Sequence, residues 1–207
     1  MTLFGSFWKK KSEEPKREMP TCKWQVGDRI ATRYEIYRIL GGEGKTGMGI
    51  VYICYDHKFK TPFALKTFRG KYSLSEQSQK LFEREALVWT ELGRYPFIVR
   101  AYWVEKIEGR LFIVLEYVAP DTEGRNTLTH FLGNLSFAEI IKFGIQFCYG
   151  MEYAYSKGIK VHRDIKPDNI MITQNKTVKI TDFGLAKPFI ESEISESGGE
   201  YKGFGIY

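Results

Sequence analysis

Two short segments in the second half of the chain contain the residue types that phosphoryl transfer needs. Residues 162–169 read HRDIKPDN, and Asp182 begins the triplet DFG a short distance further on. Such chemistry needs a carboxylate that orients an attacking hydroxyl, a cation on the moving phosphate and oxygen ligands for magnesium. We predict that Asp164 orients the hydroxyl and that Lys166 neutralises charge on the phosphate. Asn169 and Asp182 are the predicted Mg²⁺ ligands, since each offers an oxygen to a hard cation.

Ala64 and Lys66 can extend this site from the first half of the chain. Their segment, FALKTF, has the alternation of a β-strand, which puts both side chains on one face. The small Ala64 leaves room there for a flat base, while Lys66 reaches phosphate oxygens. Residues 73–92 are predicted to form a helix whose apolar face includes Glu85. A carboxylate on that face needs a partner, because an unpaired buried charge is costly.

A glycine-rich segment precedes the lysine. Residues 41–52 read GGEGKTGMGIVY, and flexible backbone N–H groups of this kind can cradle phosphates. Thr46 stands where a regular GxGxxGxV spacing needs its second glycine, so we predict a loop longer than usual, with two extra residues. A Walker A motif is excluded, because Ile39 occupies the position where that motif requires glycine. The predicted phosphate-binding glycines are Gly42, Gly44, Gly47 and Gly49.

Together these motifs resemble those of the eukaryotic-like, or Hanks-type, serine/threonine protein kinases, truncated at the C-terminal end. Lys166, two positions after Asp164, is similar to serine/threonine kinases rather than to tyrosine kinases or small-molecule kinases. The resemblance implies ATP and Mg²⁺ as cofactors and protein Ser or Thr hydroxyls as substrates. It also implies an ion pair between Lys66 and Glu85. The alternative is an ordinary strand lysine and a glutamate that reaches solvent.

The resemblance further implies an adenine site at the segment LEYV. The backbones of Glu116 and Val118 would hydrogen-bond the base. Its apolar walls would be Val51, Ala64 and Met171. The same residues are consistent with an ordinary core, since apolarity alone does not separate a binding wall from packing.

The fold class that the pattern predicts is α+β and kinase-like. Residues 1–33 are expected to be a flexible tail. Residues 34–118 are expected to form a small lobe with a five-stranded antiparallel sheet and one helix. Residues 119–207 would be a partial large lobe with the catalytic loop, the DFG triplet and the start of an activation segment. Two short strands, IMI and VKI, are predicted to pair as a hairpin that brings Asn169 and Asp182 together.

A long helix is predicted to begin at the capping pair Ser136 and Glu139 and to end at Gly158. Apolar residues recur along it at helical period, so we expect it to be largely buried. These residues are Phe137, Ile140, Ile141, Ile145, Cys148, Met151 and Tyr155. Because no APE motif or further helices follow, part of this stripe would instead expose apolar surface.

The missing helices leave two readings of the chain open. In the first, the parent protein is an active kinase, and this exact chain alone is poorly soluble with little or no activity. In the second, the chain is a truncated, inactive fragment that acts as a nucleotide-binding or interaction module. A smaller departure is Ala101, where the resemblance implies a larger aliphatic residue; Trp89 is expected to fill the gap.

An acidic, serine-rich stretch follows Pro188, where the resemblance places an activation loop. Arg163 beside the catalytic loop suggests regulation by phosphorylation, since a phosphate can pair with such an arginine. The candidate sites are Ser192, Ser195 and Ser197. A plain solvated loop is equally consistent with this composition.

Composition excludes several other classes. The chain has 207 residues, 43% of them hydrophobic, enough for one domain or one and a fraction. Its net charge of +6 is scattered, so nucleic-acid binding is not expected. Cys22, Cys54 and Cys148 lack the number and spacing of a disulfide framework or zinc site, which favours the cytoplasm. No transmembrane segment or signal peptide is predicted.

Overall fold

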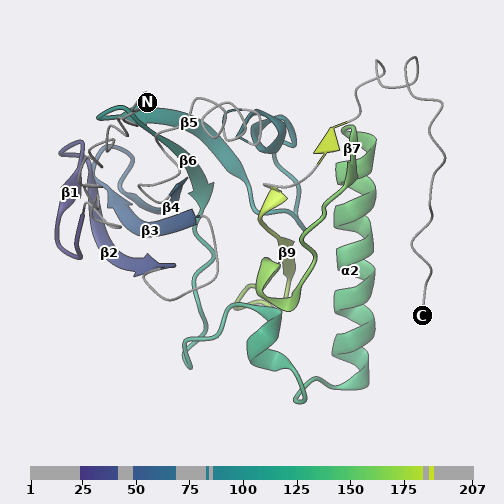
Figure 1. Cartoon of the computed structure of the whole chain (residues 1–207). Coiled ribbons are helices and arrows are strands. Elements are labelled where there is room, and N and C mark those ends of the chain that lie inside the picture. Colours follow the sequence, from purple (N-terminus) through teal and green to yellow (C-terminus); the bar gives the residue numbers. More distant parts are fainter. Residues whose placement is uncertain (1–23, 42–48, 69–82, 84–85, 184–186, 189–207) are drawn as a thin grey trace, which may run out of the picture.

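The computed structural model describes residues 24–41, 49–68, 83, 86–183 and 187–188 (Figure 1). Its first half is a curled antiparallel sheet, and its second half contains one long helix, α2, and small two-stranded elements. This is the α+β arrangement that the sequence predicts. In spatial order, the strands of the sheet are β1 (Arg29–Ile30), β2 (Tyr34–Leu40), β3 (Gly49–Asp56), β4 (Thr61–Phe68), β6 (Arg110–Glu116) and β5 (Ala101–Ile107).

The sheet has one strand more than expected, and it begins before residue 34. Strand β1 pairs with β2 across a turn in which Ala31 and Thr32 have positive φ values of 49° and 56°. Trp24 is also buried, edge-on against the rings of Tyr52 and Phe112. Residues 24–33 are therefore part of the folded unit rather than of a flexible tail. Burial of a large aromatic ring is the physical reason that they join it.

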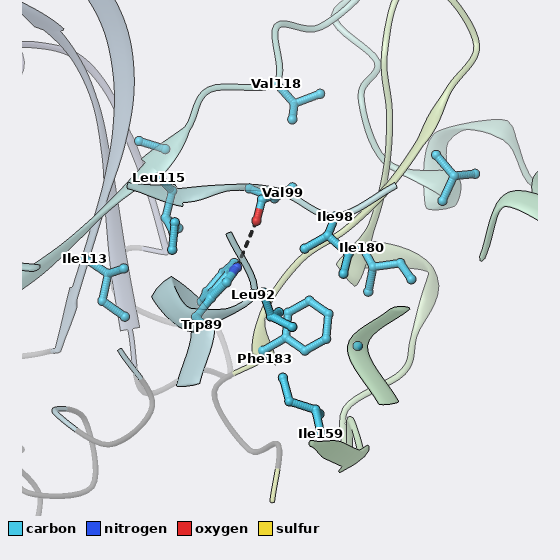
Figure 2. Packing of buried hydrophobic residues seen from close by; sticks show 14 of the residues in the cluster. Trp89, Leu92, Ile98, Val99, Ile113, Leu115, Val118, Ile159, Ile180 and Phe183 are labelled. Carbon is cyan, nitrogen blue, oxygen red and sulfur yellow. Dashed lines mark hydrogen bonds between the residues drawn. The ribbon is translucent and has the colours of Figure 1, made fainter. Parts of the chain in front are cut away.

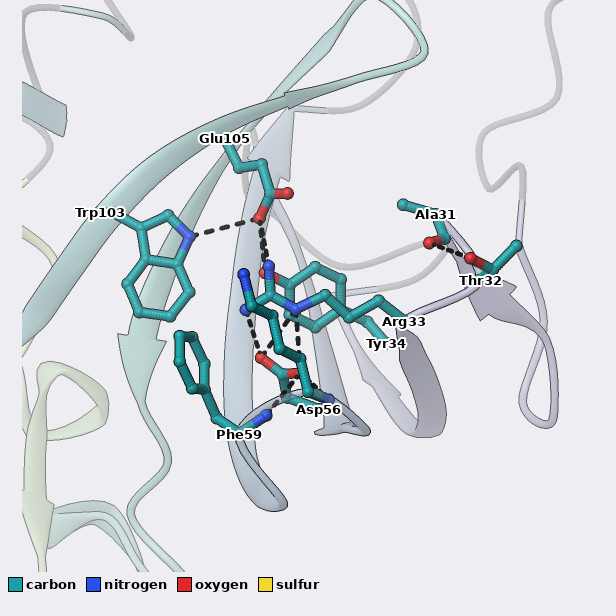
Figure 3. A network of polar contacts seen from close by, with 9 residues as sticks. Ala31, Thr32, Arg33, Tyr34, Asp56, Phe59, Trp103 and Glu105 are labelled. Atoms are coloured by element: carbon teal, nitrogen blue, oxygen red, sulfur yellow. Dashed lines mark hydrogen bonds and ion pairs between the residues drawn. The ribbon is translucent and has the colours of Figure 1, made fainter.

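A network of polar contacts surrounds Asp56 at the C-terminal end of β3 (Figure 3). The buried carboxylate of Asp56 accepts hydrogen bonds from the Arg33 guanidinium at 2.6–3.0 Å and from the backbone N–H groups of Lys58 and Phe59. Burial raises the pKa of Asp56, but these hydrogen bonds lower it by more, so the net shift is downward. The Arg33 side chain also lies 3.7 Å from Glu105 on β5. The network thus links the turn after β3 to the far edge of the sheet.

The main hydrophobic core joins the sheet to the second half of the chain (Figure 2). Residues 86–91 are helical, which agrees with the end of the predicted helix over 73–92. Trp89 and Leu92 of this region are almost fully buried. The loop of residues 97–99 crosses to β9 (Val178–Ile180): the Val99 N–H donates to Ile180 O and the Ile180 N–H to Phe97 O, both at 2.8 Å.

Helix α2 spans Phe137–Ser156, and its ends agree with the prediction. The Ser136 hydroxyl accepts from the Glu139 N–H while the Glu139 carboxylate accepts from the Ser136 N–H, which is a capping box. Gly158, with φ of +89°, follows its C-terminal end.

The predicted burial of α2 is wrong for most of its apolar stripe, whereas the accompanying expectation, that part of the stripe exposes apolar surface, is confirmed. The buried residues are Phe143, Gly150 and Ala154. Small side chains let the helix approach β9 and residue 97 closely, so the bulky residues point elsewhere. Met151 is partly buried against the core. Exposed residues of the stripe are Phe137 (79% exposed), Ile140, Ile141, Ile145, Cys148 and Tyr155.

Short elements complete the second half. They are η2 (Leu128–Phe131), β7 (Ile159–Val161), η3 (Pro167–Asn169), β8 (Ile170–Ile172) and β10 (Lys187–Pro188), and β7 pairs with β10. Strands β8 and β9 pair antiparallel, from Ile170 opposite Ile180 to Ile172 opposite Val178, which is the predicted hairpin. Among the described helices, none is long and apolar enough to cross a membrane.

Candidate active site

The β8–β9 hairpin places Asn169 and Asp182 at its open end. Asn169 immediately precedes β8, and Asp182 follows β9 after one residue. The Thr181 N–H donates to Asn169 O at 3.0 Å, so the two backbone segments are hydrogen-bonded to each other. The proximity that the sequence predicts from hairpin geometry is therefore present in the structure.

Asp164 is held by two side chains of its own loop. Its Oδ2 accepts from Lys166 Nζ at 2.7 Å and from Asn169 Nδ2 at 2.8 Å, and the same amide nitrogen also donates to Asp164 O. The hydrogen bond with Asp164 is the main reason that the pKa of Lys166 is raised. Within the described residues, Asp164 Oδ1 accepts no hydrogen bond, so it remains available to an incoming hydroxyl.

His162 holds the loop of Asp164 in place through two hydrogen bonds. Its ring is buried, and its Nδ1 accepts from the Asp164 N–H at 3.3 Å. The other nitrogen, Nε2, therefore carries the proton and donates to Thr181 O at 3.0 Å. Burial lowers the pKa of His162, which favours the neutral ring that these two bonds require. The loop of Asp164 is thus bonded to the segment that carries Asp182.

A column of rings continues from His162 into the first half of the chain. The Phe183 ring lies 4.7 Å from the His162 ring and 6.0 Å from the Trp89 ring. Trp89 Nε1 donates to the backbone oxygen of Val99 at 2.9 Å (Figure 2). Ala101 is buried in the same core. Trp89 belongs to the same cluster, and its filling of the space beside Ala101 stays a prediction.

Lys66 forms an ion pair with Asp182. Its Nζ lies 2.7 Å from Asp182 Oδ1, and it also lies 5.5 Å from the centre of the Trp89 ring. Burial raises the pKa of Asp182, but the charge and hydrogen bond of Lys66, together with the charge of Lys166 and an electrostatic contribution from His162, lower it by more, so the carboxylate is ionised at neutral pH. Sequence reasoning did not anticipate this pair. Glu85, the expected partner of Lys66, lies outside the described residues, and that pairing stays a prediction.

The donor atoms near the hairpin suit a magnesium ion. Asp182 offers an ionised carboxylate, and its backbone is in the left-handed region, with φ of +65°. The Asn169 amide nitrogen is already used by Asp164, so the amide oxygen is the atom left for a ligand. Mg²⁺ prefers one or two protein oxygens together with water and phosphate oxygens. These two side chains fit that preference.

The expected adenine walls belong to the main hydrophobic core or pack against it. Ala64 is buried in it, and Val51 and Met171 are partly buried against the same cluster. Val51 is directly opposite Lys66 in the sheet, so wall and lysine are neighbours. At the end of β6, the Val118 carbonyl accepts from Asn126, whereas no hydrogen bond from the Val118 N–H is found in the described part of the chain.

Of the four glycines predicted to bind phosphate, only Gly49 lies within the described residues. A further structurally required glycine, Gly41, was not among those predicted. A Cβ at Gly49 would lie 3.6 Å from Lys66 Cε, so this glycine lies beside the lysine. Gly41 has φ of +81°, and a Cβ there would be 2.8 Å from Gly49 O, so only glycine fits. The Gly-Gly pair at 41 and 42 was the available signal. The remaining glycines, Gly42, Gly44 and Gly47, lie outside the described residues.

The predicted phosphorylation sites also lie outside the described residues: Ser192, Ser195 and Ser197. Arg163 is exposed, with φ of 68°. An exposed arginine beside Asp164 is accessible to a phosphate group.

Comparisons with known proteins agree with this geometry. A model of the protein kinase domain matches residues 34–201. A probable serine/threonine-protein kinase of Clostridium acetobutylicum is 34% identical over 170 residues, covering 82% of this chain and 25% of that protein. The serine/threonine-protein kinase PrkC of Bacillus subtilis is 34% identical over 175 residues, covering 83% of this chain and 26% of that protein. The chain thus spans about a quarter of the length of these relatives.

A solved structure supports the same conclusion. The crystal structure of the Mycobacterium tuberculosis PknI kinase domain matches with a TM-score of 0.59 at 26% identity, covering 79% of this chain and 62% of that one. Sequence relatives and fold therefore point to one family over the same residues as the motifs. The chain belongs to the protein kinase domain family.

Proposed function

We propose that this chain carries the nucleotide-binding and phosphate-transferring residues of a serine/threonine protein kinase. The reaction moves the γ-phosphate of ATP to a Ser or Thr hydroxyl of a protein. The observation that carries this proposal is the Asp164 carboxylate, held by Lys166 and Asn169 next to the segment that brings in Asp182 and its partner Lys66. Nearly all catalysis of this reaction is positioning and charge stabilisation, which these contacts supply.

Nucleotide binding would use both halves of the chain. The base would lie between Val51, Ala64 and Met171, and the unused Val118 N–H would donate to it. The Glu116 backbone would provide the second contact to adenine. Lys66 would turn from Asp182 towards phosphate oxygens, since an ammonium on a flexible stem can serve both anions. The glycines Gly42, Gly44, Gly47 and Gly49 would cover the phosphates with backbone N–H groups.

Phosphoryl transfer would take place beside Asp164. Its free Oδ1 would accept the hydrogen bond of the attacking hydroxyl and orient the oxygen towards phosphorus. Lys166, already 2.7 Å from the same carboxylate, would neutralise negative charge on the transferred group. Asn169 and Asp182 would hold Mg²⁺, which when bound neutralises charge on the nucleotide phosphates. Glu85 would help to position Lys66.

The choice of Ser and Thr rests on Lys166 and on the names of the relatives. Cytoplasmic localisation is proposed because the reaction needs ATP and because Cys54 and Cys148 are free thiols. Regulation through Ser192, Ser195 or Ser197 is part of the proposal, and phosphopeptide mapping of active parent protein tests it. Unmodified serines in that material would remove it.

The test of the function separates catalysis from binding. Mg²⁺-ATP binding is measured on this chain by calorimetry, and incorporation of labelled phosphate into a generic basic protein is measured with the parent protein. We expect Lys66→Ala to abolish binding and Asp164→Asn to preserve binding while abolishing transfer. Transfer that survives Asp164→Asn would overturn the proposed mechanism. Binding without any transfer by the parent would favour the alternative, an inactive nucleotide-binding or interaction module.

A further inference from the structure

One cavity among the described residues has a lining that is mainly cationic and aromatic. Its volume is about 470 Å³. Its lining residues come from the loop before β5, the start of β5, the end of β6 and β9. None of its lining side chains has a role in the proposed phosphoryl transfer. The charged and aromatic residues that line it are Arg94, Arg100, Lys179, Glu116, Tyr95 and Tyr102.

The charges around this cavity do not balance. Lys179 lies 2.9 Å from both carboxylate oxygens of Glu116, so these two charges neutralise each other. Arg94 and Arg100 form no ion pair with any carboxylate among the described residues. The lining therefore has an excess of two positive charges. Guanidinium groups without a counterion beside a cavity favour an anionic ligand that can accept their paired N–H donors.

Arg100 is held in place before any ligand arrives. Its backbone N–H donates to the Glu116 carboxylate at 3.1 Å, and its backbone oxygen accepts from the Glu116 N–H at 2.8 Å. Its guanidinium lies 4.7 Å from the centre of the Tyr102 ring, a cation–π arrangement. Tyr95, on the same lining, is fixed by stacking on Tyr153 with ring centres 4.0 Å apart. Such preorganisation lowers the entropy lost on binding.

The surface continues beyond the cavity. A smaller hollow of about 200 Å³ also has Glu116 in its lining and extends along residues 117–119 and 173–175. In addition, no described strand pairs with the outer edge of β5, on which Tyr102 lies. A single inorganic anion would use only the cationic part. An extended peptide could also occupy the neighbouring hollow or lie along the free edge.

We propose that this cationic cavity is a docking site for an acidic peptide segment of a protein partner. A Glu or Asp carboxylate enters between Arg94 and Arg100, and the aliphatic part of its side chain packs against Tyr102. The adjoining hollow receives the next residues of the segment. Lys179 stays paired with Glu116 and serves as part of the wall. The cavity shares Glu116 with the predicted adenine contacts, and the adjoining hollow shares Glu116 and Val118 with them. Arg94 and Arg100 have no role in the proposed nucleotide site, so a test on these arginines is distinct from a test of the proposed function.

The test is fluorescence anisotropy of a labelled hexaglutamate peptide at physiological salt. We expect Arg94→Gln to weaken binding at least about tenfold, because it removes a charge-assisted contact. Arg38→Gln is the matched control: this exposed arginine lies on β2, and its loss changes the net charge equally. We expect binding by that variant to stay within about twofold of the original. Arg100→Gln is a second variant, with its melting temperature measured because its side chain packs on Tyr102.

Three results would overturn the proposal. Equal weakening by Arg94→Gln and Arg38→Gln would mean that the peptide responds only to diffuse charge. Displacement of the peptide by Mg²⁺-ATP would place it in the nucleotide site instead. Binding of a phosphoserine peptide or of inorganic phosphate without binding of hexaglutamate would assign the cavity to phosphate. Weaker hexaglutamate binding in Arg94→Gln and in Arg100→Gln, but not in Arg38→Gln, with no effect of Mg²⁺-ATP, supports the proposal.

Discussion

Two glycines in the interior of α2 should respond oppositely to replacement by alanine. A Cβ added at Gly144 would meet no atom within 4 Å. A Cβ added at Gly150 would lie 2.7 Å from Ile180 Cδ1 and 3.1 Å from Phe97 O. Neither neighbour can retreat easily, since Ile180 is almost fully buried and its N–H is hydrogen-bonded to Phe97 O.

The size of the difference follows from two opposing effects. In a helix interior, alanine is more favourable than glycine by about 0.8–1.0 kcal/mol, so Gly144→Ala should raise the free energy of unfolding by about 1 kcal/mol. Gly150→Ala has the same gain, but overpacking a closed core typically costs about 1–3 kcal/mol. The net change for Gly150→Ala is then a loss of about 0–2 kcal/mol. The two variants should differ by about 1–3 kcal/mol.

Urea unfolding followed by circular dichroism measures both variants against the original chain. Because the two substitutions are chemically identical and lie in the same helix, each is the control for the other. Equal stabilisation by the two substitutions would refute the reasoning, because it would mean that a methyl group at position 150 fits between α2 and β9 without strain. The dependence of the free energy of unfolding on urea concentration is compared first. A difference in this slope between variants would indicate a change in the compactness of the native or unfolded state.

Three further perturbations test other features. Trp89→Phe removes the donor to the buried Val99 oxygen and should lower the free energy of unfolding by about 1–3 kcal/mol in the same assay. Asp56→Asn should cost about 1.5–3 kcal/mol at pH 7. Because the pKa of Asp56 is lower in the folded state, the stability from its ionised form is complete above the unfolded pKa of about 3.9 and is lost as pH falls through the folded pKa. The difference in the free energy of unfolding between Asp56→Asn and the original chain should therefore shrink as the pH of the unfolding experiment is lowered. Burial raises the pKa of the Cys54 thiol to about 12, so iodoacetamide at pH 8 should label exposed Cys148 and leave Cys54 unlabelled until urea is added, as peptide mass spectrometry would show.

Each of these has a contradicting outcome. Unchanged stability of Trp89→Phe would mean that water or another donor satisfies Val99 O. If the free energies of unfolding of Asp56→Asn and the original chain differed by the same amount at every pH, the charge of the carboxylate would not contribute to stability. Rapid labelling of Cys54 in the folded chain would contradict its burial in the sheet.

Local chemistry made much of the site predictable from sequence. The hairpin that joins Asn169 to Asp182 has short β-branched strands around a polar turn, a pattern that specifies its own pairing. The capping box at Ser136 and Glu139 likewise depends only on neighbouring residues. Such features need no knowledge of distant contacts.

Features that depend on distant contacts were missed. The strand at Arg29–Ile30 forms because Ala31 and Thr32 adopt positive φ, which residues other than glycine rarely signal in a sequence. On α2, the apolar stripe suggested one buried face, whereas the close approach of β9 selects the face with Gly150. Periodicity reveals which residues share a face but not which face meets a partner.

The hydrogen bonds between residues 97–99 and β9 also determine which parts of the molecule move together. In the sequence, this loop lies between the helical residues 86–91 and strand β5. Its backbone hydrogen bonds to Ile180 nevertheless attach it to the C-terminal half of the chain. In a rigid-body rotation of one half against the other, the loop would travel with β9, and the torsional change would fall on its flanking residues. The amides of Val99 and Ile180 should consequently exchange with deuterium as one cooperative unit, at a rate distinct from that of β3.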